Sequence, residues 1–276
     1  MLKRALSIFE ACANPGCSQT RISSRLRFSG MRVGQGRYCS PVCLHEGLTR
    51  EFHDLLHRRK NVPKRQHRIP LGLLLMSRGD IDEAVLKSAL QAQKLSPGIR
   101  LGRILIDMKA VTEDQVTTAV AFQWSVPVFR LHENVVPEAA RLVPFALLER
   151  YRMLPVHYVR QRNHLHLAFV DAIDRTLLYA IEQMLGVTTE SSIARESELI
   201  PLIRMAAQQS RPAEYALNTV AEQDLAGIVR GYALRLRSEQ IDASLCGDQL
   251  WVRASGKKEP THFLLGVPVM EAVARG

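Results

Sequence analysis

The sequence predicts an α+β fold in which a helical tandem-repeat unit is followed by a small α/β domain and preceded by a small four-cysteine module. Three observations support this prediction. Residues 69–123 overlay themselves after a shift of thirty positions, residues 124–205 alternate short β-like runs with helical ones, and four cysteines fall within residues 12–43. The 276 residues leave room for two or three modest domains, and 46% apolar content is sufficient for a core.

The predicted domain boundaries follow changes in composition. A basic, apolar-poor stretch and an Ala-, Gln- and Ser-rich stretch indicate two linkers. The predicted segments are 1–49 for the four-cysteine module, 50–68 for a basic linker, 69–205 for the central domain (69–123 the tandem repeat, 124–205 the α/β part), 206–222 for a second linker and 223–276 for a small helix-plus-hairpin domain. Within the last segment, Cys246-Gly247-Asp248-Gln249 is the predicted hairpin turn.

The positive charge of the chain is concentrated near its start. Residues 1–68 hold 14 Lys/Arg and 4 Asp/Glu, whereas the rest of the chain holds 23 of each sign. This asymmetry is consistent with a polyanionic or acidic partner for the N-terminal part. A solvated, flexible arm explains it equally well. The arginines that would face such a partner are Arg21, Arg25, Arg27, Arg32 and Arg37.

The internal repeat is the strongest signal in the chain. Leu71-Gly72 aligns with Leu101-Gly102, Leu74-Leu75 with Ile104-Leu105, Ile81-Asp82-Glu83 with Val111-Thr112-Glu113, and Gln93 with Gln123. Each unit is therefore predicted to be a short helix, a turn and a longer helix. Asp82 and Thr112 are natural caps of the longer helices, because their side-chain oxygens can accept the free first-turn amides, and Thr112 with Gln115 fits a capping box.

These units resemble the tandem motif of MshEN, a cyclic di-GMP-binding domain found on type II secretion and type IV pilus ATPases. The motif runs Arg-Leu-Gly, apolar positions, a Gly, a capped helix and a closing Gln. The second unit carries Arg100-Leu101-Gly102 and closes at Gln123, and the first carries Leu71-Gly72, Gly79 and Gln93. The resemblance implies two half-sites for the dinucleotide. One would contain Arg100, Leu101, Gly102 and Gln123, and the other would contain Leu71, Gly72 and Gln93.

The residue types suit this ligand, although two positions depart from the motif. An Arg guanidinium can stack on a guanine while pairing with phosphate, and Gly lets backbone amides approach. The first unit has Pro70 where the family has Arg, with Arg68 two residues earlier, and the second has Lys109 where the family has Gly. The alternative is that the repeat is a scaffold in which the Leu-Gly pairs only pack helices.

The resemblance extends through residues 124–205. The family continues with a short strand, a helix ending near a Tyr, a Pro-containing strand, a second strand and a helix. The positions that fit this pattern are Tyr151, Pro155, Leu165, Ala168 and Asp171.

The four N-terminal cysteines have metal-ligand spacing. Cys12 and Cys17 flank an Asn-Pro-Gly turn, and Cys39 and Cys43 flank a Ser-Pro turn. Four thiolates complete a tetrahedral shell with no open position, so the pattern predicts a structural zinc in a zinc-finger-like module. The alternative is four free or core thiols. We expect Cys246, far away in an apolar hairpin, to be buried packing.

The sequence predicts no catalytic site. A P-loop requires GxxxxGK followed by Ser or Thr, but the only Gly-Lys is Gly256-Lys257, which Lys258 follows. We therefore expect a non-catalytic sensor or adaptor related to type II secretion or type IV pilus machinery, with cyclic di-GMP and secretion or pilus assembly proteins as partners. The alternative is a nucleic-acid-binding regulator that uses residues 1–68, with the central domain as a protein-docking scaffold. A short, interrupted apolar start and the lack of long apolar runs lead us to expect neither signal peptide nor membrane span, hence a cytoplasmic protein.

Overall fold

The computed structural model describes residues 11–17, 30–58, 68–131, 136–209 and 211–267. The chain forms two compact units. The terminal unit contains residues 1–62, 176–184 and 211–276, and the central unit contains residues 63–175 and 185–210. The predicted α+β fold with a tandem repeat and a small α/β part is confirmed. Arg21, Arg25 and Arg27 of the predicted basic surface lie outside the described residues.

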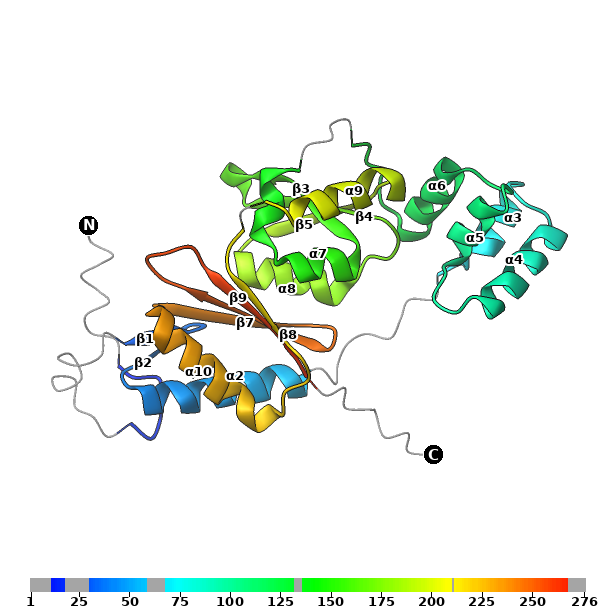
Figure 1. Cartoon of the computed structure of the whole chain (residues 1–276). Coiled ribbons are helices and arrows are strands. Elements are labelled where there is room, and N and C mark those ends of the chain that lie inside the picture. Colours follow the sequence, from blue (N-terminus) through cyan, green and yellow to red (C-terminus); the bar gives the residue numbers. More distant parts are fainter. Residues whose placement is uncertain (1–10, 18–29, 59–67, 132–135, 210, 268–276) are drawn as a thin grey trace, which may run out of the picture. The chain divides into compact units, whose positions relative to one another are not determined.

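The terminal unit is built on a six-stranded sheet of order β2-β1-β7-β8-β9-β6 (Figure 1). Its strands are β1 (Met31–Val33), β2 (Gly36–Tyr38), β6 (Glu214–Leu217), β7 (Gln240–Cys246), β8 (Gln249–Ser255) and β9 (Thr261–Gly266). The pairs β1–β2, β7–β8 and β8–β9 are antiparallel, whereas β1 runs parallel to β7 and β6 parallel to β9. The predicted hairpin turn joins β7 to β8, with Gly247 at φ +59°.

Two long helices bury their apolar stripes against one another and the sheet. Helix α2 (Pro41–Arg58) contributes Leu44, Leu48 and Phe52, which recur every four residues and therefore share one face. Helix α10 (Glu222–Leu236) adds Leu225 and Val229 to the same core. Strand residues that complete the core include Met31, Ile241, Val252 and Phe263. Cysteine 246 is fully buried, as predicted.

This architecture differs from the predicted boundaries. The four-cysteine module is not a separate domain, because β1 pairs with β7 and α2 shares a core with α10. The basic linker predicted over 50–68 is helical up to residue 58, because Phe52, Leu55 and Leu56 continue the buried stripe of α2. The second linker, predicted over 206–222, contains strand β6. This strand is formed by pairing with β9, which the sequence of 206–222 alone does not indicate.

The α/β part of the central unit follows the predicted order from Glu138 onward, whereas the short strand expected first is only an isolated bridge between Val128 and Ile193. A short 3-10 helix η4 (Glu138–Leu142) and helix α7 (Phe145–Tyr151) precede the sheet β3-β4-β5, with β3 at Met153–Val159, β4 at His164–Phe169 and β5 at Thr188–Ile193. Strands β3 and β4 are antiparallel and β4 and β5 are parallel. Helix α8 (Arg175–Leu185) lies between β4 and β5 in the chain, but its residues 176–184 belong to the terminal unit. Helix α9 (Glu196–Ala206) follows β5. The predicted helix end at Tyr151 and the strand containing Pro155 are confirmed.

The tandem repeat consists of helices α3 (Leu71–Ser77), α4 (Glu83–Leu95), α5 (Leu101–Asp107) and α6 (Glu113–Trp124). Both units have the predicted short helix, turn and longer helix. Equivalent positions of the two units, such as Leu75 and Leu105 or Ala89 and Ala119, meet in one buried core. No helix in the described part of the chain combines the length and apolarity that a membrane span requires.

Candidate ligand-binding and metal sites

The two repeats are equivalent in structure as well as in sequence. The order of buried, half-buried and exposed side chains is the same over residues 71–80 as over residues 101–110. The predicted caps are also present. Asp82 accepts a hydrogen bond from the Val85 amide at 2.8 Å, and Thr112 and Gln115 form the capping box, with the Thr112 amide donating to Gln115 Oε1 at 2.8 Å. These caps fix where each long helix begins and hence where its closing Gln lies.

The closing glutamines cross between the repeats. Gln93 of the first unit donates from Nε2 to the carbonyl oxygen of Ile99, immediately before Arg100, at 3.1 Å. Gln123 of the second unit donates from Nε2 to the carbonyl oxygen of Ile69, immediately before Pro70, at 2.5 Å. Since positions 69 and 99 are equivalent under the thirty-residue shift, the two contacts are related by internal twofold pseudosymmetry.

This crossing regroups the residues that the sequence assigned to half-sites. Helix α3 contacts α6, and α5 contacts α4, so each short helix packs against the long helix of the other repeat. Gln93 therefore lies at the start of α5, with Arg100, and Gln123 lies at the start of α3. The sequence grouped the glutamines the opposite way, because nothing in a repeat distinguishes a contact within one unit from the same contact between units.

The two Leu-Gly pairs serve helix packing. Both glycines are buried, and a Cβ atom added at Gly72 would lie 2.5 Å from Leu86 Cδ1. One added at Gly102 would lie 2.8 Å from Val116 Cγ1. Leu71 and Leu101 in turn pack into the repeat core. Of the seven predicted ligand residues, Arg100, Gln93 and Gln123 thus place polar side-chain groups at the starts of the short helices. The other four, Leu71, Gly72, Leu101 and Gly102, are used in helix packing.

Arg100 is the half-exposed charge at this surface. It occupies the N-cap position of α5 without capping the helix, and its side chain is 50% exposed. Its guanidinium forms an ion pair with Asp171, which follows β4. Asp171 forms a second ion pair with Arg152, whose Nε lies 3.3 Å from Oδ2. Arg152 Nη2 reaches Glu196 Oε1 of α9 at 2.5 Å. Arg100 is therefore connected through charges to the α/β part of the same unit.

The first repeat has Arg68 at the corresponding helix start. Its guanidinium lies over the Trp124 ring, 3.2 Å from the centroid, beside the contact between Gln123 and Ile69. Pro70 is the N-cap residue of α3, where a missing amide proton is tolerated. Arg68 thus brings a cation to the helix start that lost its motif arginine. The sequence identified Arg68 only by proximity, and nothing in it indicated that Trp124 would hold the side chain.

Lys109 adopts the conformation that the motif glycine would take. Its φ is +57°, matching +75° at the equivalent Gly79. Lys109 N–H donates to the Ile106 carbonyl at 2.8 Å, as Gly79 N–H donates to Met76 at 2.9 Å. The departure at this position therefore preserves the turn, at the energetic cost that a side chain meets in the left-handed region.

Helix α6 is connected to α9 by acidic first-turn residues that the sequence analysis did not single out. Arg195 grips Asp114 in a bidentate pair, with Nε 2.6 Å from Oδ1 and Nη2 2.5 Å from Oδ2. Glu113 accepts hydrogen bonds from the Ser197 amide at 2.8 Å and hydroxyl at 2.6 Å. These contacts cap the start of α9 and join the tandem repeat to the α/β part.

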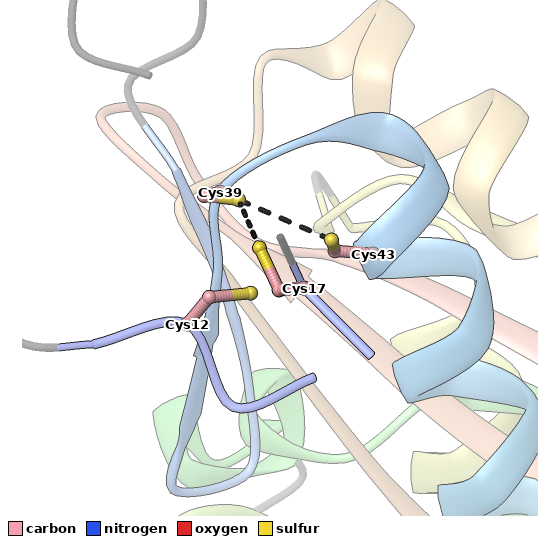
Figure 2. Close-up of side chains that lie close together, drawn as sticks. All are labelled: Cys12, Cys17, Cys39 and Cys43. Carbon is pink, nitrogen blue, oxygen red and sulfur yellow. Dashed lines mark hydrogen bonds between the residues drawn. The ribbon is translucent and has the colours of Figure 1, made fainter. Parts of the chain in front are cut away.

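The four N-terminal cysteines converge in the terminal unit. Cys12 and Cys17 lie on one segment, Cys39 follows β2, and Cys43 lies in the first turn of α2 (Figure 2). Their sulfur atoms all lie within 4.8 Å of one another, with Cys17 and Cys39 at 3.5 Å and Cys39 and Cys43 at 3.9 Å. A tetrahedral zinc with Zn–S bonds of about 2.3 Å separates its sulfurs by about 3.8 Å. The donor set and its spacing therefore fit such an ion.

Neighbouring polar groups form hydrogen bonds with the cysteine cluster. Asn14 Nδ2 donates to Cys43 Sγ at 3.4 Å while its Oδ1 accepts from the Gly16 amide at 3.2 Å, which shapes the turn between Cys12 and Cys17. Burial acts to raise the pKa of Cys43, but hydrogen bonds from Ser40 and Asn14 outweigh it and lower the pKa to about 7. Burial and neighbouring thiols raise the pKa of Cys39 to about 12.

Parts of this chain are similar to known proteins. The family model described as "MshEN domain" matches residues 124–213. A solved structure of MshE with cdg is 33% identical, covers 50% of this chain and 99% of its own, and superposes with a TM-score of 0.43. The N-terminal domain of XpsE is 19% identical over 51% of this chain and 97% of its own, with a TM-score of 0.40.

The type IV pilus assembly ATPase PilB of Thermus thermophilus is 22% identical over 121 residues, which are 44% of this chain. The match spans only 14% of the length of that curated relative. The chain therefore contains an MshEN domain, matched over residues 124–213.

Proposed function

We propose that this chain is a non-catalytic sensor or adaptor that binds cyclic di-GMP through its tandem repeat. The observation that supports this proposal is the crossed closure of the repeats, in which each Gln fixes the start of the other unit's short helix. A pseudo-twofold protein surface suits a ligand with two equivalent guanines and two equivalent phosphates. The related domain of MshE was solved with cdg.

The two half-sites would hold the ligand by different means. At the start of α5, Arg100 offers a half-exposed guanidinium for stacking on a base or pairing with a phosphate. Its ion pair with Asp171 would have to loosen or share the guanidinium when the ligand arrives. At the start of α3, Arg68 lies against Trp124 and would supply the cation that Pro70 does not. Arg100 is therefore the side chain whose loss should matter most.

Calorimetric titration of cyclic di-GMP into the full chain tests this proposal. We expect Arg100→Ala to weaken binding by about 5- to 150-fold, corresponding to about 1–3 kcal/mol for a stacked base. The matched control is Arg103→Ala, because Arg103 lies on the same helix, is 54% exposed and pairs only locally with Asp107 at 3.0 Å. Equal affinities of the two variants, or no binding by the native chain, would leave the repeat as a helical scaffold.

We also propose that Cys12, Cys17, Cys39 and Cys43 bind one structural zinc ion. The four thiolates would complete its shell, so the ion would connect the segment at residues 12–17 to β2 and α2 and leave no position for a substrate. Elemental analysis of the purified chain should give one zinc per molecule, and Cys43→Ser should lower this value. Cys246→Ser is the control, because Cys246 is buried away from the cluster. A metal-free native chain, or an inter-cysteine disulfide, would contradict the proposal.

The partner that we propose is a component of secretion or pilus machinery. The supporting observations are the match to the MshEN domain and the match to a pilus assembly ATPase. These 276 residues contain no P-loop sequence, so the proposed role for them is to bind such a machine rather than to hydrolyse ATP. Pull-down of a purified secretion or pilus ATPase, with and without cyclic di-GMP, tests this step. If no such ATPase binds, either with or without cyclic di-GMP, the adaptor role is refuted. The proposal that the chain binds cyclic di-GMP would not be affected.

A further inference from the structure

A second group of metal-ligating side chains lies in the terminal unit, apart from the four cysteines. His53 and His57 are one turn apart on α2, so they lie on the same face of the helix. Glu222 is the first residue of α10, which packs against α2. One ligand atom from each of the three residues lies within 4.8 Å of the other two. Two separate helices thus bring a pair of imidazoles and a carboxylate together.

The individual distances suit a shared ion. His53 Nδ1 lies 2.9 Å from Glu222 Oε1, and His57 Nδ1 lies 3.9 Å from the same oxygen. Metal bonds of about 2.0–2.2 Å to nitrogen and oxygen separate neighbouring ligands of a tetrahedral ion by about 3.3–3.5 Å. The observed separations lie on either side of this range, so shifts of about half an ångström would complete the geometry. The imidazole rings are stacked with centroids 3.9 Å apart.

The backbone that carries these side chains is held by the core. Phe52, adjacent to His53, is 1% exposed, and Leu225, three residues after Glu222, is fully buried. Both side chains belong to the core shared by α2, α10 and the sheet. The helices therefore keep the three ligands together without an ion, so little ordering is needed when one binds. Side-chain exposures of 58%, 32% and 41% leave the group accessible from solvent.

We propose that His53, His57 and Glu222 form a second metal site, which takes a transition-metal dication such as Zn²⁺ or Ni²⁺ from solution. Neutral imidazole suits these ions, and the carboxylate supplies a charge. With three protein ligands, the site keeps positions open for water, unlike a closed four-thiolate shell. The ion joins α2 to the start of α10 and so connects a segment near residue 55 with one near residue 222.

The site is expected to be weak and exchangeable. His57 Nδ1 lies 2.8 Å from the His53 carbonyl oxygen, and this hydrogen bond must be given up if the nitrogen binds an ion. The ion pair between His53 and Glu222 is likewise replaced by metal bonds. Water also competes at an exposed site. Binding should therefore be reversible on dilution or with a mild chelator, whereas the thiolate site retains its ion.

Calorimetry with Ni²⁺ tests the proposal on the full chain that has first been saturated with one equivalent of Zn²⁺. We expect one further binding event per chain, weakened at least tenfold in Glu222→Gln and in His57→Gln. Glu46→Gln is the matched control, because Glu46 is exposed on the same helix but outside the group. Circular dichroism melting curves of each variant check that the fold is intact.

Two results would overturn the proposal. Absence of a second binding event would mean that His53 and Glu222 form an ion pair only. A second event of equal affinity in all variants would place the ion elsewhere, on another histidine of the chain. The substitutions leave the cysteines and the tandem repeat unchanged.

Discussion

The packing role of the repeat glycines leads to a prediction about Gly102→Ala. The added Cβ would lie 2.8 Å from Val116 Cγ1 and 3.4 Å from Leu71 Cδ2. Carbon atoms in favourable contact are about 3.5–4.0 Å apart, so α5 and α6 must separate by about 0.7 Å or more. Valine cannot swing aside easily, because one χ1 rotamer dominates in a helix.

The expected loss of stability can be worked out from two opposing effects. Overpacking of a fitted core costs about 1–3 kcal/mol. Replacement of Gly by Ala in a helix returns at most about 1 kcal/mol, and less near the helix start, where Gly102 lies. The unfolding free energy of the repeat should therefore fall by about 1–2 kcal/mol. Gly72→Ala should behave alike, since its Cβ would meet Leu86 Cδ1 at 2.5 Å.

Urea unfolding followed by tryptophan fluorescence measures this effect. Trp124 ends α6, and a Trp251→Phe background leaves it as the only tryptophan, so the signal reports on the repeat. The double variant Gly102→Ala/Val116→Ala provides the internal control, because the shorter side chain at 116 makes room for the new methyl group. The double variant should lose less unfolding free energy than the two single variants lose together. Strict additivity, or an unchanged midpoint for Gly102→Ala alone, would refute the packing argument.

Three further outcomes are expected. Lys109→Gly should stabilise the central unit by about 1 kcal/mol in urea unfolding, because φ +57° strains a side chain but not a glycine; a destabilised variant would show that Lys109 makes a compensating contact. Burial, helped by the charges of Arg253 and Arg211, lowers the pKa of His262 to about 4, so the unfolded chain takes up a proton before the folded chain. The contribution of His262 to stability should be constant above about pH 6.5 and fall by about 1.4 kcal/mol per pH unit down to about pH 4, so the slope over that range should be smaller in His262→Gln. Removal of metal by a chelator under reducing conditions should lower the melting temperature of the terminal unit, and an unchanged value would argue against a structural ion.

The repeat and its caps were predictable because their signals are local. A thirty-residue shift aligns apolar positions with one another, and Asp82 and Thr112 sit directly before the helices that they cap. Both features depend on residues within a few turns of the chain. The hairpin at Gly247 belongs to the same class, because a two-residue turn between apolar runs fixes its own pairing.

Other features depend on partners far away in the chain and left no local trace. Strand β1 is only three residues long, Met31–Val33, and its place beside β7 is decided by a shared core rather than by its own pattern. The hydrogen bonds of Gln93 and Gln123 were unpredictable for a different reason, since equivalent residues of two repeats can contact either unit. The ion pair between Arg100 and Asp171 also joins residues that lie far apart in the chain.

The parallel pairing of β1 with β7 also bears on how the protein is made. Arg32 is paired with Gln240, so about 200 residues must be synthesised after β1 before its neighbour exists. At about 5–20 residues per second, this interval lasts about 10–40 seconds. During that time the segment bearing the four cysteines lacks the sheet that its strand completes, while the central unit can already fold. The nascent cysteines are therefore open to metal delivery, oxidation or chaperone capture before the domain that shelters them can close.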